Sequence, residues 1–192
     1  MQNETSGQFD GFPMLSIGKI PTSNTHSNTF KYTVKNSFEM AESIKNTQLS
    51  QDYVMVSLDV VSLFTNIPKK LVLETISTNC NEWSEQVKVP KELLVEMVEF
   101  CFESSYFRFD NKFYKLLDGS SMGNPSSPVM ANIVMNHILT EVERNLQFKL
   151  EILKIYVDDT LIAVPKNKTQ ELLETFSNYI IKSNSQWNAK LT

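Results

Sequence analysis

Arginine is almost absent from this chain of 192 residues, because Arg108 and Arg144 are the only two. Lysine and arginine together number 18, against 22 aspartates and glutamates, and the net charge is −4. The chain therefore lacks the basic excess of proteins that bind nucleic acid through bulk charge. Any phosphate contacts must come mainly from lysines and backbone amides, since clamps built from several guanidinium groups are excluded.

Cysteine is equally scarce. Cys80 and Cys101 both lie in apolar-periodic segments without a zinc-type spacing, which favours two reduced thiols in the core of an intracellular protein. No apolar run approaches the ~20 residues that cross a bilayer, and the N-terminus lacks the features of a signal peptide. We expect a nuclear or cytoplasmic protein that is neither secreted nor membrane-spanning.

The length suits one domain. Residues 1–30 are mostly polar and predict an irregular or partly disordered lead-in. Apolar periodicity then predicts several helices and strands along the rest of the chain. The predicted helices are a short one over 35–45, two that begin at Pro68 and Pro90, a long one capped by Ser127 with Pro128 at its first position, and a last one capped by Thr169.

Two places predict antiparallel pairing. Residues 106–117 are two aromatic runs around an Asp110-Asn111 turn, which is the pattern of a β-hairpin. Residues 152–164 predict two apolar strands interrupted by Asp158 and Asp159. Hairpins that alternate irregularly with helices indicate an α+β fold with an antiparallel sheet.

Carboxylates stand in two places where the pattern favours apolar residues. Asp59 ends the apolar strand that begins near Val54, and Asp158 and Asp159 separate the two later strands. Adjacent carboxylates repel one another and lose water reluctantly, but a divalent cation supplies the missing charge. Such oxygen ligands suit Mg²⁺ or Mn²⁺.

Simpler interpretations stay open for each acid taken alone. The Asp158-Asp159 pair suits ordinary turn chemistry, and Asp59 suits a helix cap at the end of a strand. A glycine- and proline-containing loop that opens a helix lies between the two acidic segments, over residues 118–128. The order is thus an acidic strand, a loop suited to backbone and base contacts, and an acidic hairpin, which is the order that template-directed polymerases use.

Three segments resemble the motifs of reverse transcriptases, in particular those of Penelope-like retroelements. Residues 57–68 (SLDVVSLFTNIP) are similar to the first catalytic motif, residues 119–132 (GSSMGNPSSPVMAN) to the second palm motif, and residues 156–159 (YVDD) to the third. The YxDD pattern alone is weak evidence, but three motifs in this order and spacing are strong evidence. The resemblance covers about residues 32–183.

The resemblance implies a right-hand polymerase palm with a ferredoxin-like core, an antiparallel sheet and packed helices. We expect the palm domain at residues 31–183 and a truncated C-terminal end at residues 184–192. Residues 11–18 stand where the basic fingers strand of the family is expected, and the sequence ends before the thumb. The expected fragment therefore has incomplete fingers and no thumb.

The resemblance also implies the roles of the acidic residues. Asp59, Asp158 and Asp159 would be the catalytic residues and would hold two Mg²⁺ ions, with Mn²⁺ as a substitute, for transfer of a nucleotide from a dNTP to a primer 3′-hydroxyl. Because neighbouring strand residues point to opposite sides, Asp159 is expected to be a less direct ligand than Asp158 unless the tight turn re-aims it. The implied partners are an RNA template, a DNA primer and a dNTP.

Five further positions are carried over as nucleotide or template contacts. The backbone at Val60 would lie near the triphosphate, and Phe64 matches the bulky ring that crowds the sugar 2′-position. Met122 and Gly123 would lie along the nascent base pair and template, where glycine permits close approach. Tyr156 would pack near the primer end. A core role for Phe64 and a structural role for Tyr156 stay open.

The sequence departs from the family pattern at Leu116, Asn124 and Ser126, where glutamine, serine and leucine are usual, and each departure is expected to loosen the loop.

The sequence leaves three functional interpretations. The chain is an RNA-directed DNA polymerase domain, or a catalytically inactive retroelement remnant that at most binds nucleic acid weakly, or an RNA-directed RNA polymerase. The bulky Phe64 argues against the third.

Overall fold

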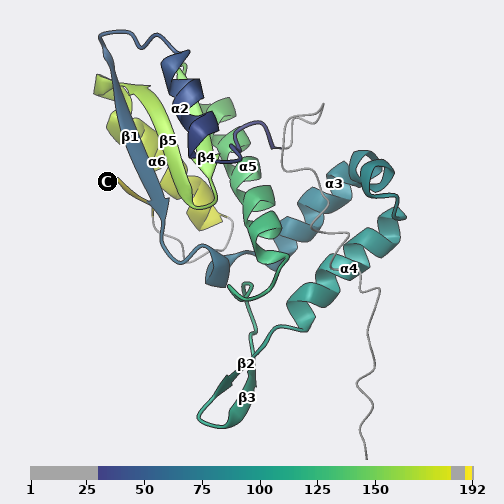
Figure 1. Cartoon of the computed structure of the whole chain (residues 1–192). Coiled ribbons are helices and arrows are strands. Elements are labelled where there is room, and N and C mark those ends of the chain that lie inside the picture. Colours follow the sequence, from purple (N-terminus) through teal and green to yellow (C-terminus); the bar gives the residue numbers. More distant parts are fainter. Residues whose placement is uncertain (1–29, 183–188, 192) are drawn as a thin grey trace, which may run out of the picture.

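The computed structural model describes residues 30–182 and 189–191 (Figure 1). The predicted lead-in lies outside these residues except for Phe30, which is buried, and residues 183–188 and Thr192 lie outside them as well. The elements are α2 (Ser37–Lys45), β1 (Tyr53–Val60), the short 3₁₀ helix η2 (Phe64–Asn66), α3 (Lys69–Val87), α4 (Lys91–Glu103), β2 (Tyr106–Phe109), β3 (Lys112–Lys115), α5 (Ser127–Asn145), β4 (Ile152–Tyr156), β5 (Asp159–Pro165), η3 (Lys166–Lys168), α6 (Thr169–Lys182) and β6 (Ala189–Leu191).

Four strands form one antiparallel sheet in the order β4-β5-β1-β6. The helices α3 to α5 connect β1 to β4, and α6 connects β5 to β6. As a result β1 and β4 run parallel with the antiparallel β5 between them. This split βαβ arrangement is that of ferredoxin-like folds. The expected α+β class with a ferredoxin-like antiparallel core is confirmed.

The two faces of the sheet differ in burial. Leu58 of β1 lies opposite Thr160 of β5, and both side chains are fully buried on the core face. Because side chains alternate along a strand, the next pair, Asp59 and Asp159, belongs to the other face. The hydrophobic pattern of β1 thus fixes which side of the sheet carries the acids.

Helix α5 is the centre of the core. It is buried on most of its circumference and contacts both α3 and α6. The side chain of Asn136 accepts a hydrogen bond from the Tyr32 backbone N–H at 3.1 Å and donates one to Thr33 Oγ1 at 2.6 Å. Thr33 in turn forms a parallel bridge to Ile155 of β4, so the segment before α2 is tied to both α5 and the edge of the sheet.

Helices α3 and α4 pack on each other beside α5, and the β2–β3 hairpin follows α4 and projects at the bottom of Figure 1. Its turn residues Asp110 and Asn111 have φ angles of 46° and 56°. Two successive positive φ angles define a type I′ turn, which suits the twist of a hairpin. The predicted hairpin and its turn are confirmed.

Two predicted caps are wrong. Helix α5 begins at Ser127, one residue earlier than predicted, and the Ser127 hydroxyl donates to the carbonyl of Ser121 in the loop. The hydroxyl of Thr169 donates to the carbonyl of Lys166 and does not accept from the helix. Both residues are the first of their helices and not the residue before, and each hydroxyl donates a hydrogen bond to a carbonyl of the preceding segment. Strand β6 was not predicted, because three residues carry too short a pattern.

The predicted helix over 35–45 is present as α2, but none of its residues is buried and Phe38 is 83% exposed. Within the described ranges, no helix is long and apolar enough to cross a membrane.

Candidate active site at the ends of the central strands

Asp59 and Asp159 lie directly opposite each other. They are the last register pair of β1 and β5 and share the face away from the core. Opposite residues in an antiparallel pair have Cα atoms about 4.5–5.5 Å apart, so the two carboxylates share one small region. Tyr156 is the register partner of Asp159 on β4 and belongs to the same face. Of the predicted site residues, these three are brought together by strand pairing alone.

Asp158 lies in the two-residue turn between β4 and β5, next to Val157. The φ angle of Val157 is 59°, a conformation that is rare for a β-branched residue and costs on the order of 1–3 kcal/mol. The turn interpretation of Asp158 is therefore correct for its position, whereas Asp159 is a strand residue. The interpretation of Asp59 as a helix cap is wrong, because Asp59 lies within β1 and is paired with β5.

Within residues 30–182, none of the three carboxylates forms an ion pair or a side-chain hydrogen bond. On β6, the register partner of Asp59 is Lys190. No group of three or more acidic, histidine or cysteine side chains in the described part of the chain is arranged to hold a metal ion by itself. Mg²⁺ is commonly bound by one or two carboxylates together with substrate phosphates. The donor set fits that mode of binding, and it does not form a closed metal cage.

The loop between the hairpin and α5 lies against the segment that follows β1. Gly119 has a φ angle of 75°, and a Cβ built on it would lie 2.1 Å from the carbonyl oxygen of Thr65. The neighbouring Ser120 N–H donates a 2.8 Å hydrogen bond to the carbonyl of Phe64. Only glycine permits this approach, so Gly119 fixes the backbone of Phe64. The sequence contained this signal in Gly119, the first residue of the second motif, but we did not predict the contact.

Hydrogen bonds hold the rest of the loop together. The Asn124 side-chain oxygen accepts from both the backbone and the hydroxyl of Ser126, at 3.0 and 2.7 Å. The Asn124 amide also donates to the carbonyl of Cys101 in α4 at 3.3 Å. The buried hydroxyl groups of Ser120 and Ser127 form a hydrogen bond, with their oxygens 2.5 Å apart. Asn124 and Ser126 are two of the departures from the family pattern, and they bond each other, contrary to the expected loosening.

Apart from Tyr156, the predicted contact residues fall into two groups. Val60 and Phe64 belong to the protein interior: the Val60 side chain is buried, and Phe64 is half-buried against the core. Met122 is 76% exposed, and a Cβ added to Gly123 would meet no atom within 4 Å. Met122 and Gly123 are therefore accessible to a ligand. Phe64 has part of the core role that the sequence had left as an alternative.

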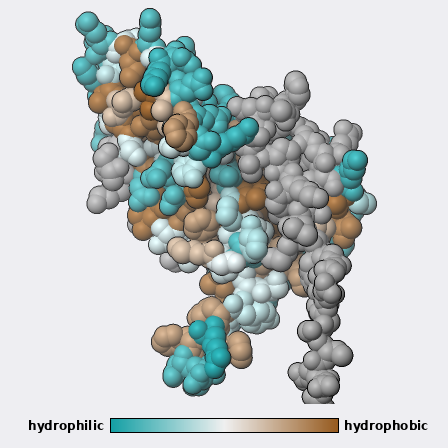
Figure 2. All heavy atoms as spheres, viewed as in Figure 1, coloured by the Kyte–Doolittle hydropathy of each residue, from teal (hydrophilic) through white to brown (hydrophobic). Residues whose placement is uncertain are grey.

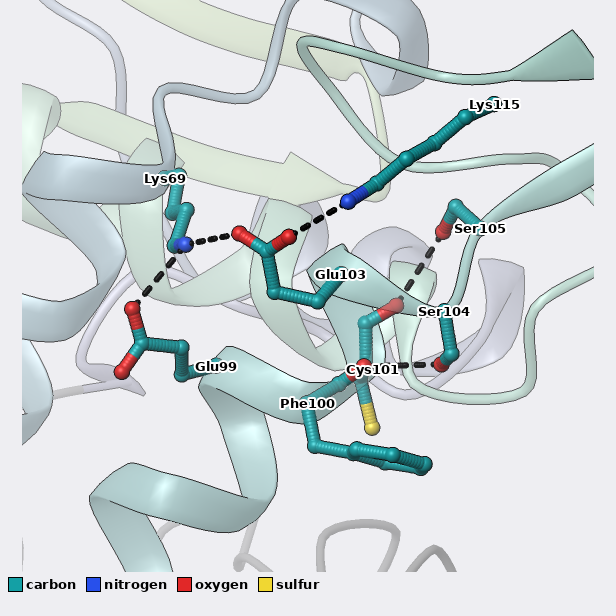
Figure 3. Close-up of polar contacts among 8 residues, drawn as sticks. All are labelled: Lys69, Glu99, Phe100, Cys101, Glu103, Ser104, Ser105 and Lys115. Atoms are coloured by element: carbon teal, nitrogen blue, oxygen red, sulfur yellow. Dashed lines mark hydrogen bonds and ion pairs between the residues drawn. The ribbon is translucent and has the colours of Figure 1, made fainter.

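An ion-pair cluster ties the hairpin to α3 and α4 (Figure 3). Glu103 at the end of α4 binds Lys69 at 2.5 Å and Lys115 at 2.6 Å, and Lys69 also binds Glu99. Hydrogen bonds from Lys115 and Lys69 lower the pKa of Glu103 to about 2. This cluster was not predicted, because its members are 34 and 12 residues apart in the chain.

A separate hollow of about 220 Å³ contains none of the predicted site residues. Lys31, Tyr32 and Glu143 lie on its wall, where Lys31 and Tyr32 each donate to the same Glu143 oxygen at 2.6 Å. Burial alone would raise the pKa of Glu143, but these two hydrogen bonds outweigh it and lower that pKa. The cluster links the start of the described chain to α5.

Comparison with known proteins places the chain among polymerases. Residues 12–191 match the family model described as reverse transcriptase (RNA-dependent DNA polymerase). The chain belongs to the reverse transcriptase family. The matched span begins at residue 12, ahead of the palm domain expected from residue 31. No curated protein matches the sequence.

Solved structures share the fold of this reverse transcriptase domain. Telomerase from Candida albicans, in complex with a fragment of telomeric RNA, has a TM-score of 0.62 at 11% identity, over 93% of this chain and 34% of its own. Apo telomerase from Candida tropicalis has the same TM-score at 12% identity, over 93% and 38%. A sicinivirus RNA-dependent RNA polymerase has a TM-score of 0.50 at 16% identity, over 79% and 30%. The polymerase palm fold is thereby confirmed, and the chain spans about a third of each of these proteins.

Proposed function

We propose that this domain is an RNA-directed DNA polymerase that adds nucleotides from dNTPs to a primer 3′-hydroxyl at the ends of β1 and the β4–β5 turn. The observation that carries the proposal is the register pair of Asp59 and Asp159, with Asp158 in the adjoining turn and no ion-pair partner for any of the three within residues 30–182. Acids so close together repel one another, and a cationic ligand removes that cost.

The chain's own residues have distinct parts in this proposal. The exposed face of β1 and β5 offers hard oxygen ligands, which fit Mg²⁺, or Mn²⁺ in its place. Bound there by Asp59, Asp158 and Asp159, the metal would lower the pKa of the attacking hydroxyl and neutralise the triphosphate. Gly119 and Ser120 hold the backbone of Phe64, and the exposed Met122–Gly123 segment leaves room for a template base.

The test is primer extension on an RNA template with Mg²⁺ or Mn²⁺. Asp59→Asn and Asp158→Asn should each lower the rate by about 100-fold or more, because removing one group that stabilises transition-state charge typically costs that much. Asp52→Asn is the matched control, an exposed aspartate just before β1 that should extend normally. Extension that is unchanged in Asp59→Asn and Asp158→Asn would refute the proposed site. No extension by the unaltered chain would favour the inactive remnant.

Phe64 decides between deoxynucleotides and ribonucleotides in this proposal. Its backbone is fixed by Ser120, so its ring has a defined position beside the core. Phe64→Ala should increase ribonucleotide incorporation relative to deoxynucleotide incorporation. The fold shared with the sicinivirus enzyme keeps an RNA polymerase as the second candidate, and preferential use of rNTPs by the unaltered chain would establish it.

The finer assignments rest on the motifs. We assign the domain to the Penelope-like group on residues 57–68, 119–132 and 156–159, and we place the palm domain at residues 31–183. Its proposed partners are an RNA template, a DNA primer and a dNTP.

A further inference from the structure

The β2–β3 hairpin exposes an unusual concentration of aromatic side chains. Every residue of both strands is exposed, and Phe109 and Phe113 are 69% and 77% exposed. Figure 2 shows hydrophobic and hydrophilic residues mixed on the protruding hairpin. Clustered exposed rings on a small unit mark a binding surface more often than chance. The rings are Tyr106, Phe107, Phe109, Phe113 and Tyr114.

The strand register distributes rings and cations over both faces of the hairpin. The pairs Phe107–Tyr114 and Phe109–Lys112 share one face, where the rings of Phe107 and Tyr114 stack with centroids 5.4 Å apart. The other face carries the remaining two pairs, Tyr106–Lys115 and Arg108–Phe113. Each face therefore combines aromatic rings with at least one cation, because alternate residues point the same way.

The charge of the hairpin is opposite to that of the chain. Residues 106–115 contain three basic residues and only Asp110 as an acid, whereas the whole chain has a net charge of −4. Arg108 donates to Asn111 at 2.6 Å, and Lys115 binds Glu103. Lys112 forms no ion pair with another described residue, so its charge is available to a ligand.

The hairpin is anchored as a unit. The Leu116 N–H donates to the carbonyl of Ser105 at 2.8 Å, which closes its base, and the Lys69–Glu103–Lys115 cluster ties it to α3 and α4 (Figure 3). Exposed apolar side chains continue beyond it, with Leu117 at 87% and Met122 at 76% exposure. Exposed apolar side chains therefore follow one another along the chain from the hairpin into the loop that contacts Phe64.

We propose that the β2–β3 hairpin binds single-stranded nucleic acid, by stacking unpaired bases on its rings and holding phosphates with Lys112. Interleaved aromatic rings and cations are the chemistry that binds single strands without sequence preference. The positive charge favours a phosphate backbone, and a second copy would oppose it with another positive hairpin. That the strand is the template of the polymerase rests on the proposed function, whereas the stacking itself does not.

The test measures binding of fluorescent single-stranded oligonucleotides to the full chain by anisotropy, in EDTA so that catalysis has no part. Phe109→Ala and Phe113→Ala should each weaken binding by about five- to 150-fold, the range found for stacking aromatics. Lys112→Ala should lower the slope of log K against log salt by about 0.7, the value for one phosphate contact on a single strand. A merely structural role would not change that slope.

Helix α2 supplies the matched control. Phe38 is 83% exposed and Lys45 is exposed on the same short helix, so the Phe38→Ala/Lys45→Ala pair removes the same two side-chain types elsewhere. It should leave binding unchanged, whereas Phe109→Ala/Lys112→Ala, a ring and a cation on one face of the hairpin, should nearly abolish it. Equal losses in both pairs, no loss in the hairpin pair, or no binding by the unaltered chain would each overturn the proposal. A hairpin pair that binds normally but no longer self-associates would instead make the surface a contact between copies.

The outcome is separable from that of the proposed function. Binding of oligonucleotides in EDTA should not depend on the polymerase site, because the hairpin contains none of the three proposed catalytic aspartates. Normal primer extension with hairpin-independent binding would refute the hairpin proposal alone. Hairpin-dependent binding without extension would refute the polymerase proposal alone.

Discussion

The end of the central sheet and the β2–β3 hairpin both present functional side chains to solvent, but they are built in opposite ways. Asp59 and Asp159 lie within paired strands and are flanked by the buried residues Leu58, Val60 and Thr160, so the core sets their positions. The hairpin has no buried residue in either strand and depends on its turn, its ring stack and the bonds at its base. The core therefore fixes the acids, whereas the fold of the hairpin is expected to tolerate the loss of its exposed side chains.

The largest expected effect tests that contrast in stability. Leu58→Ala should lower the free energy of unfolding by about 2–5 kcal/mol, because Leu58 is fully buried beside Asp59. Phe113→Ala should change it by less than about 0.5 kcal/mol, because its ring is mostly in solvent. Chemical denaturation of both variants measures the difference. Similar losses of stability in the two variants would show that the hairpin rings are as important for the fold as the core.

In the loop that joins the two regions, substitution of one glycine by alanine should destabilise the protein, whereas the same substitution at the other glycine should not. Gly119→Ala should cost about 1–2 kcal/mol or more, because the residue has a positive φ and its Cβ would meet the Thr65 carbonyl. It should also reduce primer extension by displacing Phe64. Gly123→Ala is the matched control and should leave stability almost unchanged, since its Cβ would enter open space. Thermal unfolding and primer extension measure both effects. Equal stability and equal extension rates in the two variants would contradict the role assigned to Gly119.

The acidic end of the sheet should gain stability when a charge is removed. Asp159→Asn should raise the free energy of unfolding by up to about 1 kcal/mol, because like charges opposite each other on paired strands repel. The melting temperature would then rise by about 2–4 °C while extension falls. Asp52→Asn, which has no acid opposite it, should leave both unchanged. A destabilised Asp159→Asn would show that these carboxylates are compensated within the protein.

The smallest effect concerns the anchor of the hairpin. Since the pKa of Glu103 is lowered to about 2, the Lys69 and Lys115 bonds contribute fully above the ordinary pKa of 4.5. Their contribution is lost as the pH falls from 4.5 towards 2. Glu103→Gln should speed hydrogen exchange at the Leu116 amide, which closes the hairpin base, and should remove that pH dependence. Glu96→Gln, an exposed acid on the same helix, should not affect exchange there.

Local patterns predicted most of the fold. The alternation around Asp59, the Asp110-Asn111 turn and the helix that begins after Pro90 depend on neighbours in the chain, and each is present. Strand β6 was missed, because three residues carry too short a pattern. The predicted cap at Ser127 was wrong, because its hydroxyl donates to a loop carbonyl that the local sequence does not reveal.

The candidate site was predictable in its residues but not in its contacts. The sequence placed Asp59, Asp158 and Asp159 in strands and a turn, yet the Asp59–Asp159 register follows only from strand pairing. The approach of Gly119 to Thr65 and the Glu103 cluster join segments far apart in the chain. Such contacts depend on how helices and loops pack, which no local pattern contains.

Manganese binding followed by NMR locates the metal site, since bound Mn²⁺ broadens nearby amide signals. With Mn²⁺ and a dNTP, we expect broadening of the signals of residues 57–60 and 156–160 in the unaltered chain. The same signals should stay sharp in Asp59→Asn and Asp158→Asn and should broaden normally in Asp52→Asn. Broadening that centres elsewhere, or that survives in the Asp59 and Asp158 variants, would contradict a catalytic metal site at the ends of these strands.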